Sequence, residues 1–204
     1  MTTRVLHLTA AAGLLVLTTG LAAAQNPDVT TNPENTGRAP TATQASKDDK
    51  NLKEWQVAKS AKVDLATAIA TAEGKGDEKG GKAIDADFEK AGSKNPAHYA
   101  VKVVYPSGKL VEYGINADTG EVYKTENQPI ERYFTRLKVS DFQNAKVSLK
   151  DAIALAEKTA AGGKAYEAEV EREGNAVEYE IKVALTDREQ EIKIGPDGAV
   201  KKKD

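Results

Sequence analysis

The chain has 204 residues, no cysteine and a formal net charge of −2 at pH 7. Because positive and negative side chains nearly balance, the composition gives no reason to expect nucleic acid or an anionic membrane as a partner. Without cysteine there are no disulfides, so the fold must be held together by ordinary burial of apolar side chains.

The first 24 residues have the pattern of a secretory signal peptide. Arg4 gives a positive start, an apolar run follows, and three alanines precede a polar residue. This pattern predicts cleavage between Ala24 and Gln25 and export to a bacterial periplasm or beyond. The run is too short and too rich in Thr and Ala for a convincing membrane span, although an uncleaved anchor is the alternative. No cysteine follows the cleavage site, which excludes a diacyl lipid anchor.

Residues 25–50 contain a single valine and no other large apolar side chain. Asn, Pro, Thr and Asp dominate this stretch. Such a segment cannot bury enough apolar surface to fold, and we expect a disordered tether.

After the tether the chain repeats itself in four segments that keep the same order. Their offsets shrink slowly from 84 to 78 residues. The pairs are 59–73 with 143–157, 81–90 with 163–172, 98–103 with 178–183, and 115–122 with 194–200. This predicts one ancestral unit of roughly 60 residues used twice, long enough to be a small domain rather than a solenoid repeat. We place the first repeat at 51–124, an inter-repeat segment at 125–142 and the second repeat at 143–204.

Each unit begins with a short amphipathic helix. Leucine, isoleucine and alanine recur at helical spacing over 65–72 and again over 149–156. Asp64 and Ser148 precede these helices and suit the N-cap position. Gly74, and Gly162 with Gly163, are expected to end them.

Three strands are predicted to follow each helix, because apolar and polar residues alternate with a period of two. The alternating stretches are 84–89, 98–103, 111–116, 166–170, 179–183 and 192–194. Such alternation indicates an antiparallel sheet with one solvent-exposed face. The sequence therefore predicts an α+β fold with two repeats, each a short helix packed on an antiparallel sheet and closed by a short terminal strand.

These segments resemble the PepSY domain over 59–123 and 143–201. The resemblance lies in the helix VSLKDAIALAE, the strands GGKAYEAEVE and EYEIKV, and the closing INADTGEVY. The second copy departs from the closing pattern, with Pro-Asp-Gly at 196–198. The resemblance implies a cystatin-like curved sheet around a helix. It also implies a link to the propeptides of thermolysin-type peptidases, to small exported bacterial proteins, and to the inhibition or restraint of peptidases.

The triplet Asp118-Thr119-Gly120 also occurs in aspartic proteases, where two carboxylates share a proton. Here the charged Glu121 follows, and the matching place in the second copy is the turn that contains Asp197 and Gly198. Because both copies have a turn at this place, we interpret the triplet as a hairpin turn in which Asp118 bonds local backbone.

No catalytic constellation is evident, and we expect neither an enzyme nor a cofactor or metal. The alternative function is weak binding of divalent cations or small ligands by an acidic strand face, although alternating carboxylates more often form a solvated face. The acidic residues are Asp85, Asp87, Glu89, Glu167, Glu169 and Glu171. His98 is expected to be an exposed polar residue beside them.

The aromatic residues outside the repeats are the candidates for partner contacts. Tyr133 and Phe134 share helical spacing with Ile130 and Leu137, and Trp55 precedes the first repeat. These side chains either complete the core, which we favour, or serve as exposed anchors. The predicted function is an exported, non-catalytic binding module that contacts another exported or envelope protein, with inhibition of an envelope peptidase as its specific form.

Overall fold

The computed structural model describes residues 51–201, except for the side chains of Tyr133 and Phe134. The expected signal peptide, its cleavage pair Ala24 and Gln25, and the expected tether lie outside the described residues. The helices are α1 (Glu54–Ala58), α2 (Leu65–Lys75), α3 (Pro129–Phe134), the 3₁₀ helix η2 (Val139–Asn144) and α4 (Leu149–Thr159). The strands are β1 (Lys82–Glu89), β2 (His98–Val104), β3 (Leu110–Asn116), β4 (Val122–Asn127), β5 (Lys164–Glu173), β6 (Ala176–Ala184), β7 (Glu189–Ile194) and β8 (Val200–Lys201).

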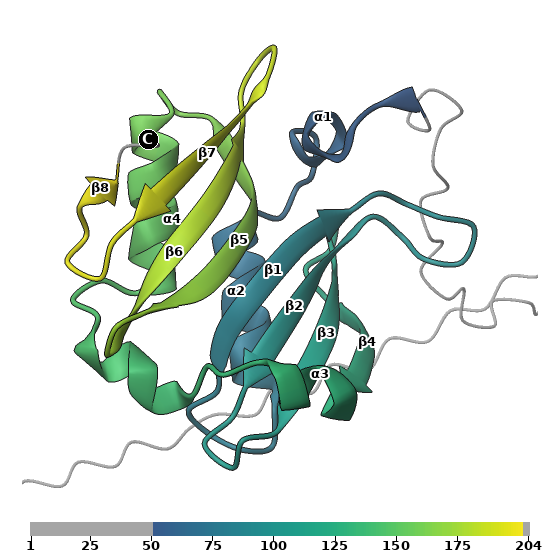
Figure 1. The fold of residues 1–204 in the computed structure, drawn as a ribbon. Coiled ribbons are helices and arrows are strands. Elements are labelled where there is room, and N and C mark those ends of the chain that lie inside the picture. Colours follow the sequence, from purple (N-terminus) through teal and green to yellow (C-terminus); the bar gives the residue numbers. More distant parts are fainter. Residues whose placement is uncertain (1–50, 202–204) are drawn as a thin grey trace, which may run out of the picture. The chain divides into compact units, whose positions relative to one another are not determined.

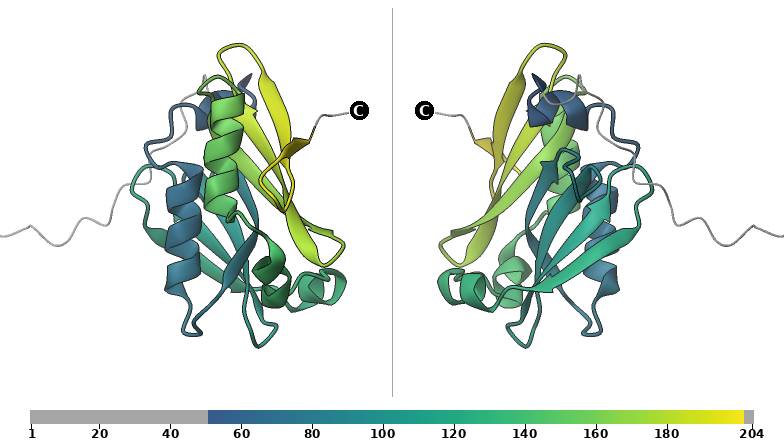
Figure 2. Two further views of the ribbon diagram at one scale, coloured as in Figure 1. Left: turned by 90° about the vertical axis from the view of Figure 1, so that its left-hand side faces the viewer. Right: turned by 90° about the vertical axis from the view of Figure 1, so that its right-hand side faces the viewer.

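All eight strands form one antiparallel sheet, in the order β4-β3-β2-β1-β5-β6-β7-β8. Helix α2 packs across β1 to β3, and α4 packs across β5 to β7. Both helices lie on the same face of the sheet (Figure 1; Figure 2, left). The predicted α+β class, with helices packed on a curved antiparallel sheet, is confirmed. The joining of both halves into a single sheet was not predicted.

The two halves of the described chain contain the same order of elements, one helix followed by four strands. The β1–β5 ladder that joins them is short, and Ala86 lies opposite Ala168 at its centre. A register shift occurs at matching places, between Ala83 and Asp85 in β1 and between Ala165 and Glu167 in β5. The duplication itself stays a prediction.

The helix boundaries follow from capping. The side chain of Asp64 accepts a hydrogen bond from Thr67 N at 2.6 Å, and Ser148 forms a capping box with Asp151. The predicted end of the first helix at Gly74 was wrong, because α2 continues to Lys75. A glycine inside a helix costs only about 1 kcal/mol relative to alanine, and that is too little to stop a helix that packs on a sheet.

Small side chains bring the helices close to the sheet. The inner faces of α2 and α4 contain alanines that are fully buried, together with one leucine and one isoleucine each. A buried tyrosine then fixes the chain just before each helix, since Tyr99 Oη donates to Val63 O at 2.9 Å and Tyr179 Oη donates to Val147 O at 2.8 Å. Burial raises the pKa of both hydroxyls, which keeps them protonated as donors.

Gly81 tests this close packing. A Cβ at Gly81 would lie 2.7 Å from both Tyr105 Cε1 and Val103 Cγ1, and both of these side chains are buried. We expect Gly81→Ala to lower the free energy of unfolding by about 1–3 kcal/mol, measured by urea denaturation. Gly74→Ala is the matched control, because no atom lies within 4 Å of its Cβ. It should raise stability by about 1 kcal/mol. Equal effects at the two sites would contradict this account of the packing.

Candidate binding surface

The turn at 116–121 is organised by an asparagine that the sequence reading did not single out. Asn116 Oδ1 accepts hydrogen bonds from Asp118 N at 2.8 Å and from Thr119 N at 3.1 Å. Gly120 has a φ of +75° and donates to Asn116 O at 2.8 Å. The Asp118 carboxylate lies 3.7 Å from Lys62 Nζ, on the segment before α2. The turn thus connects β3 to β4.

The corresponding turn in the second half connects β7 to β8. Asp197 Oδ1 accepts from Ala199 N at 3.0 Å, and Gly198 has a φ of +86°. Its backbone also holds the segment before a helix, since Lys146 N donates to Pro196 O at 2.7 Å. Asp118 and Asp197 therefore lie at separate places along the sheet, each within its own turn.

Strand β4 forms one edge of the sheet, and five of its six residues are exposed. Gln128 N donates to Leu110 O at 3.0 Å, which fixes the phase of the β3–β4 ladder. Backbone groups alternate in an antiparallel ladder, so Glu126 and Lys124 bond toward β3. Thr125 and Asn127 consequently direct their N–H and C=O groups outward. No strand in residues 51–201 pairs with this outer side.

A buried histidine lies beside β4 on the sheet face opposite the helices. His98 was expected to be exposed, and this was wrong, because only 4% of it is accessible. The ring of Tyr123 covers it edge to face, with centroids 5.1 Å apart. His98 Nδ1 donates to Pro96 O at 2.9 Å, and Nε2 lies 3.4 Å from a Glu89 carboxylate oxygen. Gly114 makes room for Tyr123, since a Cβ there would lie 2.6 Å from the ring.

Four carboxylates meet where β1 pairs with β5, also on this face. Asp85 lies opposite Glu169, and Asp87 lies opposite Glu167. Like charges directly opposite each other destabilise a ladder. Burial, together with the neighbouring Asp85 and Glu167 carboxylates, raises the pKa of Asp87 from 3.8 to about 7. Burial also raises the pKa of Glu169.

Lysines on the flanking strands offset part of this repulsion. Lys102 Nζ on β2 lies 2.7 Å from Asp85 Oδ2 and 2.8 Å from Glu131 Oε1 on α3. Lys182 Nζ on β6 lies 2.6 Å from Glu167 Oε1. Within the described part of the chain, no group of three or more His, Cys, Asp and Glu residues is arranged to hold a metal ion. The predicted alternative, cation binding by this face, therefore gains no support from the geometry.

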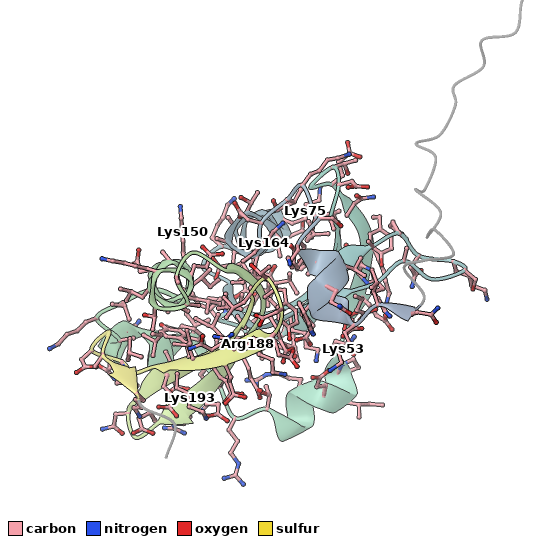
Figure 3. The ribbon with its side chains drawn as sticks, turned by 90° about the horizontal axis from the view of Figure 1, so that it is seen from above. Lys53, Lys75, Lys150, Lys164, Arg188 and Lys193 are labelled. Carbon is pink, nitrogen blue, oxygen red and sulfur yellow. The ribbon has the colours of Figure 1, made fainter. Side chains whose placement is uncertain are left out.

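Two pockets lie away from the carboxylates. One, of about 630 Å³, is lined by the end of α4 and by Lys59, Lys164 and Arg188. Figure 3 labels Lys164 and Arg188. Burial lowers the pKa of Lys164, whose Nζ donates to Ala61 O. The other, of about 750 Å³, separates α2 from η2 and the start of α4 and includes apolar side chains. Neither was predicted, because both are formed by elements that are far apart in the sequence.

The residues considered as partner contacts differ in their exposure to solvent. Trp55 is 8% exposed and belongs to the core, and Lys59 Nζ lies 5.9 Å from its ring centroid. Leu137 is also buried, whereas Ile130 is 78% exposed, contrary to the favoured core assignment. Ile130 is exposed because its neighbours on α3 make the contacts with the sheet: Glu131 with Lys102, and Arg132 with Gly108 O. The side chains of Tyr133 and Phe134 lie outside the described residues.

Comparisons with known proteins identify the first half. The family model described as "Peptidase propeptide and YPEB domain", PepSY, matches residues 62–126, from just before α2 into β4. This segment matches the PepSY family, as the sequence resemblance indicated. Among solved structures, a Clostridium difficile 630 protein provisionally described as a lipoprotein is similar at 22% identity, covering 60% of this chain and 80% of its own. Its TM-score is 0.37, which is too low to support a conclusion. No curated protein matches the chain.

No helix in residues 51–201 is both long enough and apolar enough to cross a lipid bilayer.

The carboxylates at the β1–β5 ladder should make stability depend on pH. The folded-state pKa of Asp87 lies above its ordinary value of 3.8, so the folded state binds this proton more tightly than the unfolded chain. Stability should therefore fall as pH rises from about 4 to 7, by about 1–2 kcal/mol after allowance for partial exposure. Asp87→Asn should flatten this slope in urea unfolding measured across that range. The control Glu121→Gln, at an exposed turn position, should retain it. An identical slope in Asp87→Asn and wild type would contradict the assignment.

Proposed function

We propose that this protein is an exported, non-catalytic binding module that restrains a peptidase of the cell envelope. The observation that carries the proposal is the outer side of β4, at the end of the segment that matches PepSY, with which no strand of residues 51–201 pairs. An extended segment can add to such an edge, taking its affinity from main-chain hydrogen bonds and its specificity from alternate side chains.

The surroundings of β4 suit this mode of binding. The turn at 116–121 holds the start of the strand, and Tyr123 is anchored against His98, so the edge is ordered before a partner arrives. An edge that is already ordered loses less conformational entropy on binding. Ile130, at the start of α3 just beyond the strand, adds an exposed apolar side chain within the same stretch of the chain.

Two further observations support export and a peptidase partner. The first 24 residues have the composition of a signal peptide, and the matched family takes its description from peptidase propeptides. The partner in this proposal is an envelope peptidase or another exported protein that offers an extended segment.

Peptidase activity in an envelope extract, measured with and without the purified protein, tests the proposal. We expect inhibition by the wild type at micromolar concentration. Thr125→Pro should weaken it about five- to tenfold, because proline removes one outward N–H without removing a β3–β4 hydrogen bond. Thr125→Ala keeps that N–H and is the matched control. An extract in which no class of peptidase responds to the wild type would contradict the proposed function.

A further inference from the structure

We propose that β4 is a self-complementary edge, through which two copies of this chain pair antiparallel about a twofold axis at Thr125. The inference does not depend on a peptidase, because it concerns only the chemistry of the edge itself. It rests on the backbone phase of β4, on the order of its charges and on the contrast with the other edge of the sheet.

The backbone phase places hydrogen bonds on the axis. Thr125 directs its N–H and C=O away from β3, as the bond from Gln128 N to Leu110 O requires. With the axis at Thr125, its N–H donates to the C=O of Thr125 of the second copy, and the reverse bond forms equally. Two residues from the axis, Asn127 of one copy lies opposite Tyr123 of the other.

The order of the charges fixes this register. One residue on either side of the axis, Lys124 faces Glu126 of the second copy, and the pair occurs twice. These are non-hydrogen-bonded positions of the new ladder, where side chains approach most closely. Moving the axis to Lys124 would place two lysines opposite each other, and moving it to Glu126 would place two glutamates opposite each other. Among these three registers, only the one centred on Thr125 pairs opposite charges.

In the single copy, two carboxylates at this edge share one lysine, and pairing would supply a second lysine. Glu126 lies directly opposite Glu112 of β3, a like-charge pair. Lys124 Nζ bridges them, at 2.8 Å from Glu126 Oε2 and 3.4 Å from Glu112 Oε1. One lysine thus serves two carboxylates. In the paired form, Lys124 of the second copy approaches Glu126 from its outer side. Each Glu126 carboxylate then has a lysine on both sides.

The opposite edge of the sheet consists of β8 and of the outer side of β7 from Glu189 to Ile192, with which no strand of residues 51–201 pairs. Those four residues of β7 include no lysine or arginine, so this edge lacks the complementary charges of β4. Within residues 51–201, strand β8 consists of Val200 and Lys201. Its ammonium group contacts Glu173 and Glu178 of its own chain. A pairing of β4 with β8 would therefore have a short ladder, whereas β4 with β4 pairs five residues of each strand, from Tyr123 to Asn127.

Sedimentation velocity of the full chain, at about 10–300 µM and low ionic strength, tests the pairing. Wild type should show a dimer that grows with concentration. Lys124→Glu and Glu126→Lys should each weaken self-association by roughly tenfold or more, because each change makes both cross-strand pairs like-charged. An equimolar mixture of the two single variants should regain the dimer, since their charges then complement each other. The double variant K124E/E126K should regain it alone.

Thr125→Pro keeps every charge and should also weaken the dimer, because it removes the hydrogen bonds on the axis. Circular dichroism shows that each variant is folded before its association is compared. A wild type that stays monomeric over the whole range would overturn the inference. So would single variants that dimerise as well as the wild type, or a mixture of them that remains monomeric.

Discussion

The pairing of β1 with β5 is the constraint on which the rest of this structure depends. It converts two helix-and-strand units into one sheet, and it sets α2 and α4 on a common face. The two faces of the sheet at the centre of this ladder require different side chains. On the helix side, Ala86 and Ala168 are small enough to let the helices approach. On the other side, four carboxylates must be neutralised by Lys102 and Lys182 or by protonation. The stability of the joined sheet is thereby linked to the acidity of its surroundings.

Local patterns predicted most of the elements. Helical spacing in 65–72 and 149–156, and alternation in the strands, depend only on residues near one another in the chain, and the structure contains those elements. The single sheet was not predictable in this way, because β1 and β5 are separated by about 80 residues and an alternating strand does not reveal its neighbour. The sequence shows that carboxylates and alanines alternate in both β1 and β5, but this alternation is equally typical of a solvated face.

The surface was harder to predict than the fold, since exposure depends on neighbouring strands. His98 alternates as a polar residue should, yet Tyr123 from β4 covers it, across a glycine of the strand between them. Ile130 shares helical spacing with Leu137, yet Glu131 and Arg132 contact the sheet in its place. The turn at 116–121 was visible as a turn, whereas the role of Asn116 depends on backbone geometry that several polar residues could satisfy.

The unequal edges of the sheet have a consequence for the size of any assembly. A sheet with two long open edges can add copies without limit and form a filament. Here β4 carries a lysine and a glutamate that complement a second copy. At the far edge, Lys201 is held by its own chain, and the open residues of β7, Glu189–Ile192, carry only acidic charges. An edge that pairs with the same edge of a second copy has no free side after one event, and the far edge offers a third copy no complementary charges. Growth then stops at a closed pair, which keeps a sheet-rich protein away from open-ended aggregation.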